Sequence, residues 1–145
     1  MDAGTMLREI GVGSSFLLSS LGSVIGTFIV GSAAIGAWKK CYIQNKPAPF
    51  VLVAYGGAPL TNIIYGYILM TQLMAATNLS DFQLFYFGAL AGIVIGISAY
   101  TQARVAAYAC ESFAETGQGF GNNIMMVGLC ETIALFTMVF TILVA

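Results

Sequence analysis

Residues 10–38 read IGVGSSFLLSSLGSVIGTFIVGSAAIGAW, and no charged residue interrupts the chain between Glu9 and Lys39. This apolar stretch exceeds the roughly 20 residues that a helix needs to cross a bilayer core. The whole chain has the same character, since 59% of its 145 residues are hydrophobic and only 8% are charged. A soluble domain carries about 25% charged residues. The composition therefore predicts an integral membrane protein and argues against a soluble domain, a disordered chain or a nucleic-acid-binding protein.

Three further runs contain at most one charged residue each, at residues 47–80, 82–103 and 116–145. Their hydrophobicity is continuous rather than alternating, which favours helices over the strands of a membrane barrel. We therefore predict an all-α membrane protein with four transmembrane helices, over residues 11–38, 49–76, 82–110 and 121–144.

The connections between these helices are short, so that neighbouring helices are expected to run antiparallel. Three lysines gather in the first connection, and Arg104 lies near the third. The positive-inside rule then predicts that loops 39–48 and 111–120 are cytoplasmic and that both termini lie outside. The first run is expected to be a permanent span, because Asp2 and Glu9 lie where a cleavable signal carries positive charge.

The sequence is internally doubled. Leu-Gly-Ser-Val-Ile-Gly at 21–26 resembles Ala-Gly-Ile-Val-Ile-Gly at 91–96, and weaker matches continue in the partner helices. We therefore predict two tandem helical hairpins, residues 1–76 and 77–145. Small residues recur every four or five positions in the first and third helices, among them Gly22, Gly26, Gly92 and Gly96. Such residues let helix backbones approach closely in lipid, and two equivalent stripes suit the inner layer of a homo-oligomeric ring.

Glu131 is the most informative residue because it lies about ten residues into the last predicted span. Apolar sequence flanks it on both sides, so we expect its carboxyl group near the middle of the bilayer. A charge at that depth costs at least ~2.5 kcal/mol, and ionisable residues inside membranes mark ion or substrate paths by default. A structural hydrogen bond between helices is the less favoured interpretation. Glu131 is therefore predicted to hold a proton or a cation.

Several polar residues are predicted to share the depth of Glu131. Gln102 lies at a similar distance from the third connection, while Thr61 and Asn62 lie near the middle of the second helix. Tyr65 follows Thr61 by four residues and shares its helix face. Interhelical hydrogen bonding is the alternative role for Thr61 and Asn62.

Pro59 is expected to disturb the second helix, because proline lacks an N–H. Its position would free the carbonyl of Tyr55 and let the carbonyl of Ala58 turn inward. Carboxylate, amide, hydroxyl and carbonyl oxygens would then converge on one point, as a hard cation requires. A single negative charge favours a monovalent cation over a divalent one.

Three motifs follow one another along the chain: Pro-Leu-Thr-Asn-Ile-Ile-Tyr-Gly at 59–66, Thr-Gln-Ala-Arg-Val-Ala-Ala at 101–107 and Gly-Leu-Cys-Glu-Thr at 128–132. Their order and spacing together are specific. With the doubled hairpin and the glycine-rich odd helices, they make the chain resemble the membrane-rotor proteolipid (c or K subunit) of V-type and A-type rotary ATPases. The resemblance implies that Glu131 carries one Na⁺ or H⁺ per protomer.

The resemblance further implies a sodium site, with H⁺ as the alternative and no organic cofactor. Sodium-carrying members have a similar site, in which side chains match Gln102, Thr61 and Tyr65 of this chain and a backbone carbonyl matches that of Ala58. Those members have Gln where this chain has Asn62, which is one methylene shorter. Direct ligation by Asn62 is therefore an open question, and a water or a small helix shift would fill the gap.

The implied mechanism is rotary, in a prokaryotic plasma membrane. Copies of the chain would form a homo-oligomeric ring in lipid, attached to central stalk subunits. Beside the ring would lie a stator membrane subunit, whose Arg pairs with the Glu131 carboxylate when its ion has left. ATP hydrolysis would take place in other subunits, because this sequence has no Gly-x-x-x-x-Gly-Lys-Ser/Thr loop. The resemblance thus implies a non-catalytic component.

Two other interpretations remain at this point. A small four-helix proton-coupled exporter acting as a dimer also has one intramembrane Glu, although usually early in its chain. A purely structural four-span protein would keep its function without the carboxyl group of Glu131.

Overall fold

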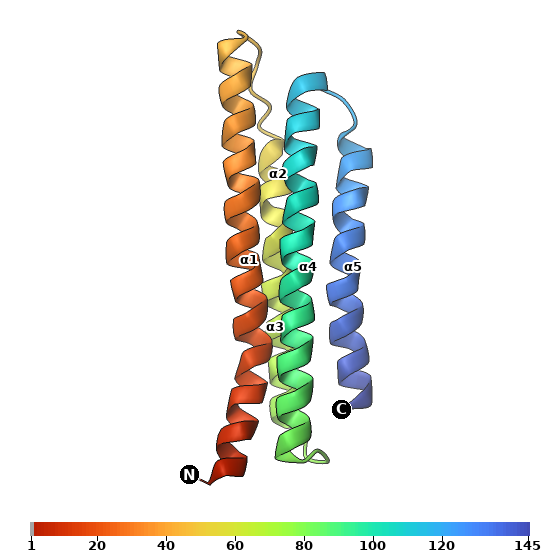
Figure 1. The fold of residues 1–145 in the computed structure, drawn as a ribbon. Helices are drawn as coiled ribbons and strands as arrows, with labels where there is room; N and C mark the ends of the chain where they lie inside the picture. The colour runs from red at the N-terminus through yellow and green to blue at the C-terminus, as the bar shows by residue number, and fades with distance from the viewer. Residues whose placement is uncertain (1) are drawn as a thin grey trace.

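The computed structural model describes residues 2–145, which form a bundle of long helices (Figure 1). These residues contain helices and no strand: α1 (Ala3–Ile43), α2 (Leu52–Gly57), η1 (Ala58–Leu60), α3 (Thr61–Ala75), α4 (Asp81–Thr116) and α5 (Phe120–Val144). Four stretches are long and apolar enough to cross a membrane, with Leu52–Ala75 counting as one of them. The chain is therefore an integral, multi-pass membrane protein, and the predicted all-α class with four spans is confirmed.

Two of the helices extend well beyond the apolar runs that predicted them. α1 has 41 residues and α4 has 36, which correspond to about 61 and 54 Å at the usual helical rise. Charged residues end an apolar run but do not end a helix, because Lys and Glu are good helix formers. The extensions carry an exposed ion pair, in which Lys40 Nζ lies 3.6 Å from Glu115 Oε1.

Local sequence signals explain where the helices begin and turn. The Asp2 carboxylate accepts hydrogen bonds from the hydroxyl and the N–H of Thr5, and these bonds lower the pKa of Asp2. Ser80 and Gln83 form a capping box at the start of α4. The turn between α4 and α5 uses Gly117 and Gly119, whose φ angles of 68° and 81° suit glycine.

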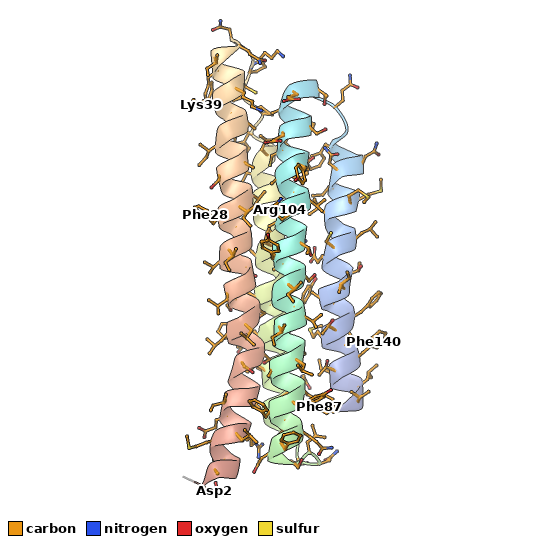
Figure 2. The ribbon with its side chains drawn as sticks, viewed as in Figure 1. Asp2, Phe28, Lys39, Phe87, Arg104 and Phe140 are labelled. Carbon is orange, nitrogen blue, oxygen red and sulfur yellow. The ribbon has the colours of Figure 1, made fainter. Side chains whose placement is uncertain are left out.

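The two hairpins place all described loops at the ends of the bundle. In Figure 1 both chain ends lie at the end that holds the turn between α3 and α4, and the other two connections lie at the opposite end. Figure 2 shows Asp2 and Lys39 at these opposite ends, and Phe28 and Phe140 pointing away from the bundle. Phe28 is 74% exposed and Phe140 is 60% exposed, as expected for surfaces that face lipid or a neighbouring protein.

Helices α1 and α4 run side by side in the same direction, and glycine makes their close approach possible. A Cβ atom on Gly22 would overlap the backbone of Gly96, and one on Gly92 would lie 2.7 Å from the carbonyl oxygen of Ser14. A Cβ on Gly26 would lie 3.0 Å from Pro59 Cβ. The four glycines singled out in the sequence therefore all lie in tight helix contacts.

The packing register of α1 and α4 differs from the register of the sequence repeat. The repeat aligns Gly22 with Gly92, whereas in space Gly22 lies against Gly96, one helical turn further along α4. Glycine is not a packing residue everywhere, because a Cβ on Gly31 or Gly36 would meet nothing within 4 Å in this chain.

Candidate cation site

Glu131 lies where α5 packs against α3 and α4, between two buried apolar clusters. The cluster toward the α4–α5 turn includes Tyr55 of α2 and Val127 of α5, and the cluster toward the chain ends includes Leu69 of α3 and Ala134 of α5. The Glu131 side chain itself is half-buried. The carboxyl group is thus flanked along the bundle axis by apolar layers.

Two side chains from other helices donate hydrogen bonds to Glu131. The Tyr65 hydroxyl lies 2.7 Å from Oε1, and Gln102 Nε2 lies 3.2 Å from Oε2. Each carboxylate oxygen therefore has one donor, the first from α3 and the second from α4. Hydrogen bonds of this kind to an ionised acceptor are stronger than those between neutral groups, so they help to hold a carboxylate inside the bundle.

Asn62 extends this network to a third member. Asn62 Nδ2 donates to Gln102 Oε1 over 2.8 Å, and both side chains are completely buried. Asn62 Oδ1 is also buried and has no hydrogen-bond partner. A continuous chain of side-chain hydrogen bonds therefore runs from Asn62 of α3 through Gln102 of α4 to Glu131 of α5, with one acceptor left over at its beginning.

Pro59 replaces one turn of the second span by a 3₁₀ turn, η1. Thr61 donates both its N–H and its hydroxyl to the carbonyl of Ala58, the latter over 2.9 Å. The carbonyl of Tyr55 accepts the N–H of Ala58, so the prediction that proline frees this carbonyl is wrong. In a 3₁₀ turn the carbonyl finds its donor three residues later instead of four, and the gap left by proline is closed.

Four of the six predicted site residues are connected by side-chain hydrogen bonds. These four are Glu131, Gln102, Asn62 and Tyr65, whereas the hydroxyl of Thr61 donates to the carbonyl of Ala58. The sequence predicted that both amides would present oxygens to one point. Instead, Gln102 presents its nitrogen to Glu131, because a carboxylate is an acceptor and needs donors.

Ser98 belongs to the same layer and was missed in the sequence. Its hydroxyl donates to the carbonyl of Cys130, the residue before Glu131, over 2.7 Å. This bond ties α4 to α5 at the depth of the carboxyl group. Ser98 precedes Gln102 by four residues, so a search for polar residues on the Gln102 face of the helix would have found it.

The donor set fits a monovalent cation better than a divalent one. Among residues 2–145 no three His, Cys, Asp or Glu side chains gather into a metal-binding group. A cation at Glu131 would therefore be held by one carboxylate and by neutral oxygens. The hydroxyl of Thr61 donates a hydrogen bond to the carbonyl of Ala58 and keeps its own lone pairs as acceptors.

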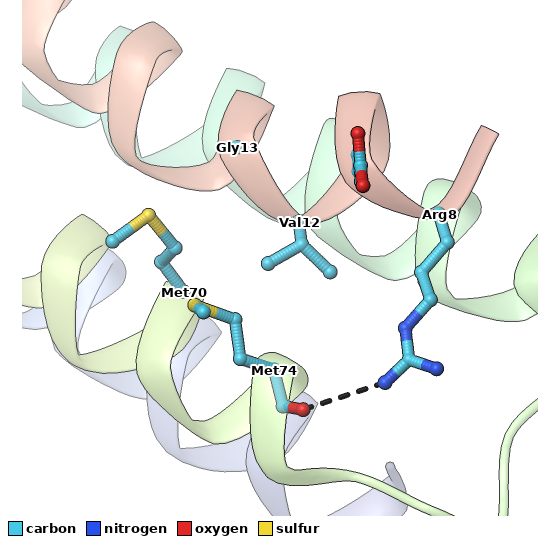
Figure 3. A pocket seen from close by; sticks show the side chains of 6 residues that line it. Arg8, Val12, Gly13, Met70 and Met74 are labelled. Atoms are coloured by element: carbon cyan, nitrogen blue, oxygen red, sulfur yellow. Dashed lines mark hydrogen bonds between the residues drawn. The ribbon is translucent and has the colours of Figure 1, made fainter. Parts of the chain in front are cut away.

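A pocket of about 290 Å³ lies elsewhere, between α1 and α3 near the chain ends (Figure 3). Arg8 lines it and donates to the carbonyl of Met74 over 3.4 Å. None of the residues that line the pocket belongs to the hydrogen-bond network of Glu131. The pocket is therefore separate from the Glu131 network.

Two comparisons with known proteins bear on this arrangement. Residues 85–144, which include Gln102 and Glu131, match the family model of the C subunit of ATP synthase. Over 140 residues, 95% of its length, the chain is 27% identical to the A-type ATP synthase subunit K of Methanocaldococcus jannaschii. The chain spans 61% of the length of that curated relative.

Proposed function

We propose that this chain is a rotary ATPase proteolipid of the c/K family, and that it is a rotor component that carries one cation across the membrane on Glu131. The observation that carries the proposal is the position of Glu131: a carboxyl group in the last span, between apolar layers, held by donors from two other helices. The family match includes this residue and its partner Gln102. A carboxyl group in such a place is costly and is therefore expected to have a function.

Na⁺ is the ion we propose, with H⁺ as the alternative. Proton carriage needs only the carboxyl group, whereas a cation also needs neutral oxygen ligands. Two buried amides belong to the hydrogen-bond network of Glu131, Gln102 directly and Asn62 through Gln102, and the Thr61 hydroxyl lies on the same helix as Asn62. These polar groups are costly to bury in a membrane protein, and Na⁺ binding gives them a use beyond helix contact.

The proposed transport step is the reversible neutralisation of Glu131. With a cation bound, the pair has no net charge, and the protomer can face lipid at acceptable cost. Without it, the charged carboxylate requires a polar or positively charged environment, which an Arg of a stator subunit would supply. Rotation then carries each neutralised protomer through the lipid from one access path to the other.

The rotor itself would be a homo-oligomeric ring in lipid, coupled to central stalk subunits. The close contact of α1 and α4 makes these helices suitable for the narrow inner layer, with Glu131 on the outer side of the pair. As a rotor component the chain is not an enzyme by itself, and ATP would be hydrolysed by other subunits. We place the loops 39–48 and 111–120 in the cytoplasm of a prokaryotic cell, with the termini outside.

Carbodiimide labelling of the assembled membrane complex tests the proposal, since this reagent modifies protonated buried carboxyl groups. We expect labelling at Glu131 and slower labelling when Na⁺ is added at fixed pH. If the labelling rate does not depend on Na⁺ but falls as pH rises, the transported ion is H⁺ and not Na⁺. Labelling slowed by a lipophilic drug, together with a dimer-sized particle in mild detergent, would favour an exporter and contradict the rotor.

The substitution Glu131→Gln tests the role of the carboxyl group directly. We expect the complex to assemble and ATP-driven ion transport to be abolished, because Gln has no negative charge with which to bind and release a cation. Glu115→Gln is the matched control, since Glu115 lies in an exposed ion pair outside the site. Full transport by the Glu131→Gln complex would overturn the proposed function.

A further inference from the structure

The hydrogen bonds around Gln102 have a definite direction. Asn62 donates to the Gln102 oxygen over 2.8 Å, and the Gln102 nitrogen faces Glu131 Oε2 over 3.2 Å. Both amides are completely buried, so water does not compete for either end. Each end of the Gln102 amide is therefore assigned by its protein neighbours alone.

A cation shared by Glu131 and Gln102 requires the opposite orientation of Gln102. Amide nitrogens do not ligate hard cations, whereas amide oxygens do. A half-turn of the terminal amide would direct the Gln102 oxygen toward Glu131 and its nitrogen toward Asn62. The nitrogen, being only a donor, then needs an acceptor on Asn62.

Asn62 has that acceptor free. Its Oδ1 is buried and unpartnered, next to the Nδ2 that now bonds Gln102. If both amides turn together, the bond from Asn62 Nδ2 to Gln102 Oε1 is replaced by a bond from Gln102 Nε2 to Asn62 Oδ1. Between the two amides the exchange breaks one hydrogen bond and makes one, and the bond from Gln102 Nε2 to Glu131 Oε2 is replaced by the cation that Gln102 Oε1 and Glu131 then share. Asn62 Nδ2 takes the place of Asn62 Oδ1 as the one amide atom without a partner, so the number of unpaired buried polar atoms does not rise.

We propose that Asn62 is a positioning residue that acts through Gln102, and that the two amides exchange donor and acceptor roles when Na⁺ binds beside Glu131. The inference rests on the proposed function and adds a role for Asn62 that is not that of an ion ligand. Asn62 is given this indirect role because its short side chain bonds to Gln102, and Gln102 in turn bonds to Glu131. An apolar residue at position 62 would leave one end of Gln102 unpaired in both orientations.

A double-mutant cycle tests whether Asn62 acts through Gln102. The midpoint Na⁺ concentration that protects Glu131 from carbodiimide is measured for the wild-type complex, Asn62→Leu, Gln102→Leu and the double variant. We expect each single substitution to raise the midpoint about tenfold and the double variant to match Gln102→Leu alone. If the two effects add in full, Asn62 contributes to Na⁺ binding independently and the proposal is wrong.

Side-chain amide NMR of the ¹⁵N-labelled complex tests the exchange itself. We expect Na⁺ to shift the side-chain amide resonances of both Asn62 and Gln102, and to leave that of Asn78, an exposed loop residue, in place. A shift of Gln102 with Asn62 unmoved would overturn the exchange. Asn62→Ala, which removes the amide without adding bulk, takes the place of Asn62→Leu in the double-mutant cycle if the leucine variant does not assemble.

The wild-type arm separates failure of this inference from failure of the proposed function. If Na⁺ fails to protect wild-type Glu131, the sodium function falls, and the exchange falls with it. If wild-type protection is normal but the cycle is additive or the Asn62 resonance is fixed, only the exchange is overturned.

Discussion

Gly22 of α1 lies directly against the backbone of Gly96 of α4, with no space for a side chain between them. This contact holds the two parallel helices together and thereby helps to fix the position of Gln102, which lies about 1.7 turns further along α4. The consequences of this contact and of three hydrogen bonds near Glu131 can each be measured.

Gly22→Ala is expected to destabilise the complex by about 1–3 kcal/mol, because the added methyl group overlaps the backbone of Gly96 and forces the helices apart. Gly36→Ala is the control, since a Cβ there meets nothing within 4 Å in this chain. We expect the control to be unchanged or slightly more stable, because alanine favours a helix. Thermal unfolding of the detergent-solubilised complex measures both, and equal losses would contradict the packing described.

Tyr65→Phe is expected to weaken the proposed Na⁺ binding at Glu131 about tenfold. The substitution removes the 2.7 Å hydrogen bond to Glu131 Oε1, and bonds to charged groups are worth about 1.5–3 kcal/mol. Tyr67→Phe is the control, because Tyr67 is 53% exposed on the same helix. The measurement is the Na⁺ concentration that half-protects Glu131 from carbodiimide. An unchanged midpoint for Tyr65→Phe would show that this bond does not help to hold the carboxyl group.

Thr61→Val tests the proposed ligand role of the Thr61 hydroxyl. The substitution keeps the shape of the side chain and removes the oxygen, so we expect at least a roughly fivefold weaker Na⁺ affinity. Thr71→Val is a matched control, because Thr71 makes the same hydrogen bond to the carbonyl three residues earlier on α3. If both substitutions change Na⁺ affinity equally, the Thr61 hydroxyl affects only the helix backbone and is not an ion ligand.

Ser98→Ala removes the hydroxyl that ties α4 to the carbonyl of Cys130. We expect a loss of about 1 kcal/mol in stability, the usual value for one hydrogen bond, and weaker Na⁺ binding because α5 is held less firmly. Ser23→Ala is the control, since Ser23 is buried but bonds only within α1. Thermal unfolding and Na⁺ protection are measured on the same preparations. If Na⁺ binding is unchanged while stability falls, Ser98 acts on the bundle and not on the site.

Much of the fold and part of the site were predictable from the sequence. Charge-free runs revealed four spans, because a bilayer admits only long apolar helices. Glu131 stood out for the same reason, as a carboxyl group where none is tolerated without a use. Gln102, Asn62 and Tyr65 were found by their depth, which depends only on the number of residues from a loop.

Local rules were less successful where two groups compete for one partner. The sequence located the disturbance at Pro59, but it did not reveal that the 3₁₀ turn would supply Tyr55 with a donor and occupy the Ala58 carbonyl with Thr61. Nor did it indicate the bond from Ser98 to Cys130. Both depend on which donor lies nearest after folding.

What the sequence by itself determined is the number of membrane spans and the depth of the polar residues, because both follow from hydrophobicity counted along the chain. Only the tertiary structure decided the one-turn offset between Gly22 and its repeat partner, and which end of the Gln102 amide faces Glu131. The offset depends on which side-chain volumes on α1 fit those on α4. The amide orientation depends on acceptors and donors that three separate helices bring together.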